Sequence, residues 1–162
     1  MILTGSNEFK IIKDSLPIGV NLLAVSKGHK HDSIRKLSGY GQLDFGESRL
    51  QEAILKKIDL SDLTQLRWHF VGTLQKNKVR RVIKEFDFIH SVDSLPLLER
   101  ISRISQEEQK SPNIFLQVKF IEDANKGGFL KEELLKSWSK ITSLKNINLI
   151  GLMTIPPIVL NS

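Results

Sequence analysis

The chain has 162 residues and no cysteine, and its 24 lysine and arginine residues against 18 aspartate and glutamate residues give a formal charge of +6. This length suits one domain, and 40% hydrophobic with 26% charged residues is a globular composition, not a disordered one. The lack of cysteine excludes a disulfide framework and a thiolate zinc site. No apolar run approaches the roughly 18 residues of a membrane span, and the first residues show no secretory signal. We therefore expect a cytoplasmic protein without a membrane partner.

Short apolar segments alternate with longer charged segments of helical periodicity along the whole sequence. This order predicts parallel strands joined by helices. No Gly/Ser/Pro-rich linker divides the chain, so one domain over 1–162 is expected. The expected strands are Leu22–Ser26, Leu43–Gly46, Trp68–Gly72, Phe86–Ser91, Ile114–Phe120 and Leu149–Thr154, and the expected helices are His31–Leu37, Glu47–Lys57, Lys76–Lys84, Ser94–Gln109 and Lys131–Leu144.

Strands that are apolar throughout are buried on both faces, which indicates a parallel sheet covered by helices. Two α/β architectures fit this pattern: an open doubly wound sheet, or a (β/α)₈ barrel of which about six units are present. In both of them the functional site forms outside the carboxyl ends of the strands.

Polar side chains follow the expected strands, and they include amines, imidazoles, hydroxyls and a carboxylate. Lys27 directly follows the apolar run Leu22–Ser26. Partial desolvation there would favour its neutral amine, which can attack an aldehyde. A lone lysine at a strand end more often only extends its ammonium into water. The other residues at these ends are Glu47, Ser48, His69, Thr73, His90, Ser91, Asp93, Lys119, Lys126, Met153 and Thr154.

Several of the remaining features favour structural interpretations. His29 and His31 resemble a metal pair only superficially, because no third ligand accompanies them. His69 is equally compatible with a core position and a site, and Asp93 more often hydrogen-bonds the turn that opens the next helix. The basic residues of the segment Lys76–Lys84 are the one hint of nucleic acid, but no aromatic residues are interleaved to stack bases. A nucleic-acid partner is therefore not expected.

The strand-end motifs resemble a known family when they are read in order. They are AVSK (24–27), FGES followed by QE (45–52), WHFVGTLQKNK (68–78), HSVD (90–93), LQVK with a later KGG, and GLMTI (151–155). Together they resemble the pyridoxal phosphate homeostasis protein family of the YggS/PROSC type, over about Leu22 to Ile155. The resemblance implies a single alanine-racemase-like (β/α)₈ barrel that binds pyridoxal 5′-phosphate (PLP).

The resemblance also assigns roles to individual residues. Lys27 occupies the position of the lysine that forms an imine with the cofactor, while His90 and Met153 match residues that line the pocket. Ser48 and Lys119 each stand where the family usually has an asparagine. We predict a cofactor site of Lys27, Ser48, His69, His90 and Met153.

The resemblance implies a non-enzymatic protein of intracellular PLP homeostasis, which holds the cofactor and delivers it to PLP-dependent apoenzymes. One alternative is an alanine-racemase-like enzyme, which needs a second acid/base, usually a tyrosine from a second domain; the sole tyrosine is Tyr40. Others are a basic RNA-associated module and a truncated, non-functional member.

The ends of the chain depart from the family pattern. Family chains continue beyond GLMTI to a seventh and an eighth strand that bind the phosphate, whereas this sequence ends at Ser162. About 60 to 80 residues would complete a barrel of usual length. The N-terminus is also short for the helix that precedes the first strand. The expectation is a C-terminally truncated member.

Overall fold

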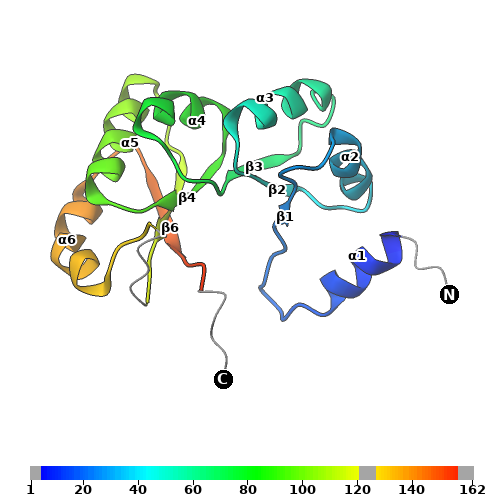
Figure 1. The fold of residues 1–162 in the computed structure, drawn as a ribbon, viewed down its shortest axis with the longest axis horizontal. Coiled ribbons are helices and arrows are strands. Elements are labelled where there is room, and N and C mark those ends of the chain that lie inside the picture. Colours follow the sequence, from blue (N-terminus) through cyan, green and yellow to red (C-terminus); the bar gives the residue numbers. More distant parts are fainter. Residues whose placement is uncertain (1–4, 121–126, 157–162) are drawn as a thin grey trace. The chain divides into compact units, whose positions relative to one another are not determined.

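A computed structural model describes residues 5–120 and 127–156 (Figure 1). The chain divides into two compact units, unit 1 (Met1–Trp68) and unit 2 (His69–Ser162), and the division falls inside strand β3 (Arg67–Phe70). A single domain over 1–162 stays a prediction. None of the helices in the described ranges has the length and apolar character to cross a membrane.

Unit 1 contains helices α1 (Gly5–Asp14), α2 (His31–Gly39) and α3 (Leu50–Asp59), strands β1 (Ala24–Val25) and β2 (Asp44–Glu47), and the start of β3. β1 pairs in parallel with β2, and the N–H of Arg67 in β3 donates to the carbonyl of Leu43 (2.8 Å). Its core includes Phe9, Ile34, Phe45, Ala53 and Trp68.

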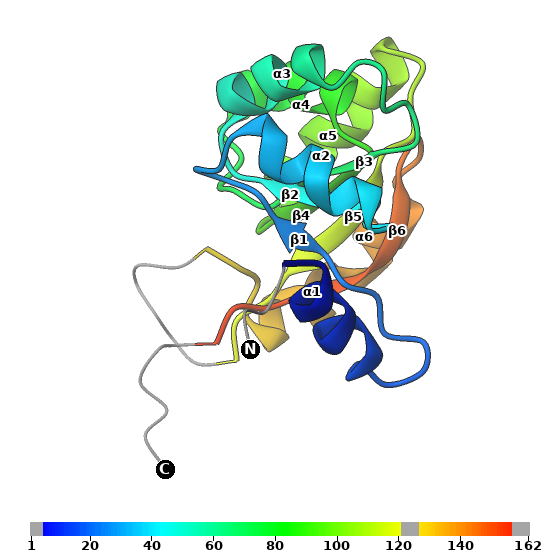
Figure 2. The same cartoon turned by 90° about the vertical axis from the view of Figure 1, so that its right-hand side faces the viewer.

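Helix α1 corrects one expectation, because a helix does precede the first strand. Its residue Phe9 is buried and packs against Tyr40, with ring centroids 6.3 Å apart. This contact gives a short N-terminal helix an apolar partner. Helices α1 and α3 lie at opposite ends of unit 1 in both views (Figure 1, Figure 2).

The described part of unit 2 contains the rest of β3 and six further elements of regular α or β structure. The 3₁₀ turn η1 (Lys76–Lys78) leads into α4 (Val79–Glu85), and β4 (Phe88–Val92), α5 (Leu95–Glu107), β5 (Asn113–Gln117), α6 (Lys131–Ser143) and β6 (Asn148–Met153) follow. The strands pair in parallel in chain order, β3 with β4, β4 with β5 and β5 with β6. A doubly wound sheet reverses its order at a switch point. The unbroken order of unit 2 is the winding of a barrel.

Helix α5 shows how the apolar pattern sets the packing in unit 2. Leu97, Leu98, Ile101 and Ile104 are all buried, as their helical spacing predicts. Ser94 occupies the N-cap position, but its hydroxyl donates to Asp93 Oδ1 (3.1 Å) and accepts no N–H of the first helical turn.

Three predicted boundaries are wrong for identifiable reasons. β1 is short because the Leu22 carbonyl accepts from the side chain of Gln42 (2.8 Å) and not from a neighbouring strand. β5 ends at Gln117, since Val118 and Lys119 pair with the returning Phe129, and Phe120 is 82% exposed. The helix predicted from Glu47 begins at Leu50, because Glu47 belongs to β2.

Candidate functional site

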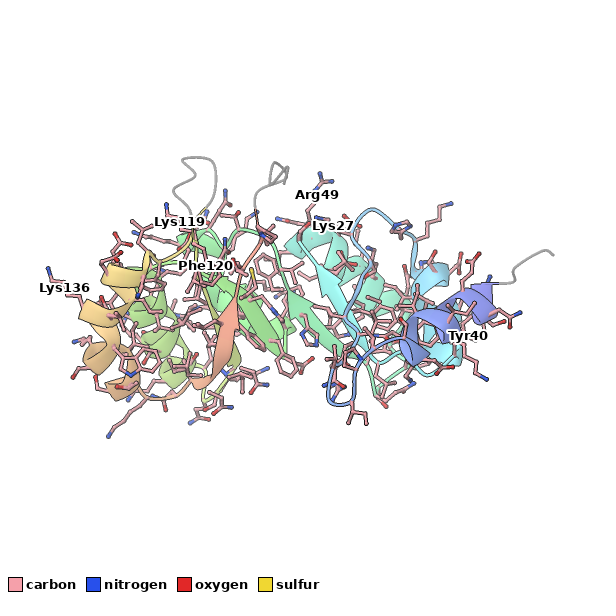
Figure 3. All side chains as sticks on the ribbon, turned by 90° about the horizontal axis from the view of Figure 1, so that it is seen from below. Lys27, Tyr40, Arg49, Lys119, Phe120 and Lys136 are labelled. Atoms are coloured by element: carbon pink, nitrogen blue, oxygen red, sulfur yellow. The ribbon has the colours of Figure 1, made fainter. Side chains whose placement is uncertain are left out.

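Lys27 lies in a tight turn directly after β1. The N–H of His29 donates to the carbonyl of Ser26 (3.0 Å), and Gly28, the third residue of the turn, has a φ of +77°. A positive φ at that position is what a type II turn requires, and glycine adopts it without strain. Lys27 is exposed, so the expected partial desolvation of its amine is wrong; the turn projects beyond the end of the strand. Figure 3 places Lys27 well away from Tyr40 within unit 1.

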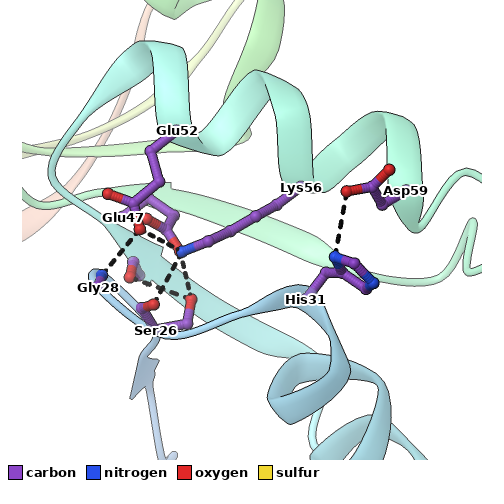
Figure 4. A network of polar contacts seen from close by, with 8 residues as sticks. Ser26, Gly28, His31, Glu47, Glu52, Lys56 and Asp59 are labelled. Atoms are coloured by element: carbon purple, nitrogen blue, oxygen red, sulfur yellow. Dashed lines mark hydrogen bonds and ion pairs between the residues drawn. The ribbon is translucent and has the colours of Figure 1, made fainter.

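A buried polar network lies directly beside this turn (Figure 4). The ammonium of Lys56, a residue only 6% exposed, donates to Glu47 Oε1 (2.6 Å), Glu52 Oε1 (2.7 Å) and the Ser26 carbonyl (2.9 Å). The hydroxyl of Ser26 donates to Glu47 Oε1 (2.6 Å), and the N–H of Gly28 donates to Glu52 Oε1 (2.8 Å). The residues on both sides of Lys27 are therefore held by side chains of β2 and α3.

The hydrogen bonds of this network set the protonation of Glu52, its half-buried member. The hydrogen bond from Lys56, and then the hydrogen bond from the Gly28 N–H, lower the pKa of the Glu52 carboxyl below its ordinary value. Both bonds favour the ionised carboxylate. Glu52 is therefore ionised near neutral pH. The sequence motifs did not predict this network, although Glu52 and Lys56 stand at the i, i+4 spacing typical of a helical ion pair.

Two lysines thus lie near the end of β1 in very different states. All three N–H groups of Lys56 have acceptors. The amine of Lys27 forms no hydrogen bond or ion pair with any other residue that the structure describes. Of the two, Lys27 alone offers a free amine.

Ser48 lies at the same edge of unit 1 as Lys27. It follows β2, the parallel neighbour of β1, and it is half-buried between that strand and α3. Its hydroxyl makes no hydrogen bond to a described residue. Two of the predicted site residues are therefore brought to one strand edge. Arg49, the next residue, is exposed and occupies the N-cap of α3 (Figure 3).

Two imidazoles meet inside unit 2. Nδ1 of His69 lies 2.9 Å from Nε2 of His90. His69 is stacked on Phe88 (centroids 4.2 Å apart) and His90 on Phe115 (4.4 Å). Desolvation, and secondarily the charge of His69, lower the pKa of His90 to about 4. His90 is therefore a neutral ring at neutral pH.

The remaining predicted residues of unit 2 lie near the ends of its strands. Met153 is the half-buried last residue of β6, and its carbonyl accepts from Val118 (2.9 Å). Asp93 follows β4, and a Cβ atom added to Gly127 would lie 2.5 Å from Asp93 Oδ2. Gly127 thus packs closely on Asp93. Lys126 lies outside the described residues.

Comparison with known proteins decides the family. The model of the family "Alanine racemase, N-terminal domain" matches residues 6–159. The pyridoxal phosphate homeostasis protein of Synechocystis sp. is 42% identical over 147 residues, which cover 91% of this chain and 67% of the relative. This chain belongs to the pyridoxal phosphate homeostasis protein family. The corresponding protein of Pseudomonas aeruginosa is 40% identical over 140 residues, 86% of this chain and 60% of the relative. The chain thus spans about two thirds of the length of these family members.

Solved structures agree with the assignment to the pyridoxal phosphate homeostasis protein family. PipY of Synechococcus elongatus without PLP has a TM-score of 0.93 at 42% identity, over 96% of this chain and 73% of that chain. PipY with PLP bound has a TM-score of 0.90 at the same identity, over 96% of this chain and 72% of PipY. An alanine racemase of Clostridium difficile, at 19% identity, has a TM-score of 0.72 over 90% of this chain and 38% of the racemase, which shows the alanine-racemase-like fold. The predicted fold class is confirmed.

In this family member, side chains that suggested a metal site or nucleic-acid binding are paired with carboxylates. His31 faces Asp59 (Nδ1 to Oδ2, 3.1 Å), and the described residues contain no cluster of three or more metal-ligating groups. On α4, Arg80 pairs with Glu107 and Glu108, and Lys84 pairs with Glu108 (2.8 Å). Two cations of the basic segment are therefore neutralised by Glu107, the last residue of α5, and by Glu108, which caps that helix. Lys119 is half-buried and lies two residues beyond the end of β5 (Figure 3).

Proposed function

We propose that this chain binds pyridoxal 5′-phosphate through Lys27 and serves the intracellular homeostasis of that cofactor without enzymatic turnover. The observation that carries the proposal is the free, exposed amine of Lys27 on the turn after β1, beside a second lysine whose donors are all occupied. A relative with 42% identity, PipY, has been solved with PLP bound. The related proteins are named for homeostasis of pyridoxal phosphate and not for a reaction.

The residues present fit such a group. When bound, the cofactor would supply an aldehyde, which condenses with a primary amine and releases water. Lys27 supplies that amine, and the hydroxyl of Ser48 at the same strand edge is free to donate or accept a hydrogen bond. We propose His69, His90 and Met153 of unit 2 as further binding residues. His90 is a neutral ring at neutral pH, so it adds no cationic charge.

The role in the cell follows from the chemistry of a reversible covalent carrier. We propose that the chain holds PLP in the cytoplasm and gives it up to PLP-dependent apoenzymes. An amine on an exposed turn is open to exchange with other amines, which suits release. A buried lysine would instead shield the bound cofactor from other amines and favour its permanent retention.

Reduction with borohydride after incubation with PLP tests the proposal. Peptide mass mapping should find the reduced adduct on Lys27, and the Lys27→Ala variant should lose it. The matched control is Lys136→Ala, which removes an exposed lysine of α6 (Figure 3) and should leave the adduct unchanged. An adduct scattered over surface lysines, or one that persists undiminished in Lys27→Ala, would show that the assignment is wrong.

The alternative function is that of an alanine-racemase-like enzyme, and the position of Tyr40 argues against it. Tyr40 caps α2 ahead of β2, whereas Lys27 follows β1, so in parallel strands they lie at opposite edges. An acid/base group must reach the reacting atoms within hydrogen-bond distance. We expect no interconversion of L- and D-alanine above the rate with free PLP. Turnover that Lys27→Ala abolishes would overturn the non-enzymatic function.

A further inference from the structure

Lys56 occupies an unusual position for a lysine, because its ammonium is buried and saturated. Its three N–H groups meet the Ser26 carbonyl, Glu47 Oε1 and Glu52 Oε1 at 2.9, 2.6 and 2.7 Å. An ammonium has three donors, so none remains for a ligand. Lys56 therefore acts on its neighbours and not on a bound molecule.

The acceptors of Lys56 connect it to both flanks of Lys27. On one side, Ser26 gives its carbonyl to Lys56 and its hydroxyl to Glu47 (2.6 Å). On the other side, the N–H of Gly28 donates to Glu52 (2.8 Å). Lys27 is the single residue between these two held groups. We name Lys56, Glu47 and Glu52 the Lys56 clamp (Figure 4).

The composition of the Lys56 clamp points to geometry and not to stability as its role. Glu47 is 0% exposed, and its Oε2 has no hydrogen-bond partner among the described residues. Apolar residues of similar volume commonly replace a buried ion pair with no loss of stability. An ion pair with an unpaired buried oxygen is thus a poor stabiliser. What this one achieves is to fix three groups of one turn: the carbonyl and the hydroxyl of Ser26 and the N–H of Gly28.

We propose that Lys56 is a positioning residue, which through Glu47 and Glu52 locks the turn Ser26–His29 and presents the amine of Lys27 in one orientation. The value of that orientation rests on the proposed function. The lock itself is a property of the chain without cofactor, because all its contacts lie within unit 1. Misplacing a reacting group by about 1 Å can cost about 100-fold in rate, so a locked turn matters for attachment.

Hydrogen exchange in the cofactor-free protein tests the lock. The amide of Gly28 should be protected, and in Lys56→Met and Glu52→Ala it should exchange about tenfold faster, since its acceptor is displaced or removed. Glu52→Gln retains an acceptor oxygen and should restore most of the protection. Lys136→Met, on an exposed face of α6, is the control and should leave this amide unchanged.

Borohydride trapping of PLP on Lys27 tests the consequence. Labelling of Lys27 should slow about tenfold in Glu52→Ala and much less in Glu52→Gln, at an unchanged rate for the other lysines. If Lys56→Met does not fold, the two Glu52 variants decide alone. Equal Gly28 exchange, or equal Lys27 labelling, in wild type and Glu52→Ala would overturn the proposal. A wild-type chain that is never labelled at Lys27 refutes the proposed function instead, and the exchange rates still decide on the lock.

Discussion

His69 and His90 share a hydrogen bond of 2.9 Å between Nδ1 and Nε2, with each ring stacked on a phenylalanine of unit 2. One nitrogen of the pair must donate and the other accept, which requires at least one neutral ring. Burial, reinforced by the neighbouring imidazole, lowers the pKa of His90 from 6.5 to about 4. The pair therefore couples the packing of β3 and β4 to pH.

The first prediction concerns this pH dependence. A folded-state pKa below the unfolded value means that the unfolded chain binds the proton first, so His90 destabilises the fold progressively as the pH falls from 6.5 towards 4. Above pH 6.5 the effect is absent. Urea unfolding at a series of pH values should show a free energy of unfolding that declines over this window.

Replacement of the ring isolates its contribution. His90→Phe keeps an aromatic surface against Phe115 but cannot titrate, so the decline between pH 6.5 and 5 should weaken. His29→Gln, at an exposed position, is the control and should retain it. Identical slopes in His90→Phe and wild type would refute the assignment to His90.

The second prediction compares two isoleucines on helices. Ile101 of α5 is 0% exposed and Ile58 of α3 is 64% exposed. Ile101→Ala leaves a cavity and should lower the free energy of unfolding by about 2–5 kcal/mol. Ile58→Ala should change it by less than about 0.5 kcal/mol. A similar loss in both variants, measured by urea denaturation, would contradict the packing of α5 described above.

Much of the fold could be predicted because it depends on local periodicity. The α5 stripe with Ile101 needs only the 3.6-residue repeat, and six apolar runs mark six strands. The errors arise where a side chain overrides the local pattern. The side chain of Gln42 donates to the carbonyl of Leu22, which shortens β1. Phe129, more than ten residues further along the chain, pairs with the residues after Gln117 and so ends β5. Such long-range partners leave no periodic trace in the sequence.

The candidate site was predictable only in part. Lys27 and Ser48 follow neighbouring parallel strands, so their common edge follows from topology alone. The burial of Lys56 does not, because an isolated lysine on a helix is normally exposed. Lys56 is buried because it donates to Glu47, and Glu47 is the last residue of β2 and not the first residue of α3. Because the predicted helix began at Glu47, three residues before the start of α3 at Leu50, the sequence did not predict the Lys56 clamp.

The third prediction concerns the basic segment of α4. Because Arg80 and Lys84 are paired with Glu108, the C-cap residue of α5, the protein should not shift generic single-stranded RNA at about 150 mM salt. Glu108→Lys removes the shared acceptor and adds a cation, so it should create salt-dependent binding. Glu132→Lys on α6 adds the same charge elsewhere and serves as the control. RNA binding by wild type that falls steeply with salt would revive the RNA-associated alternative.

The fourth prediction contrasts two glycines with equal space and different backbone angles. A Cβ atom at Gly28 or at Gly39 would meet nothing within 4 Å, but only Gly28 has a positive φ, +77°. Gly28→Ala should therefore lower the free energy of unfolding by about 1–2 kcal/mol through backbone strain alone. Gly39→Ala, in α2, should raise it by about 0.4–1 kcal/mol, because alanine restricts the unfolded chain and favours the helix. Gly28→Asn should cost less than Gly28→Ala, since asparagine adopts the left-handed region more readily. Thermal and urea unfolding of the three variants measures these changes, and a shift of the same sign for both alanine variants would show that the turn holding Lys27 does not need its left-handed residue.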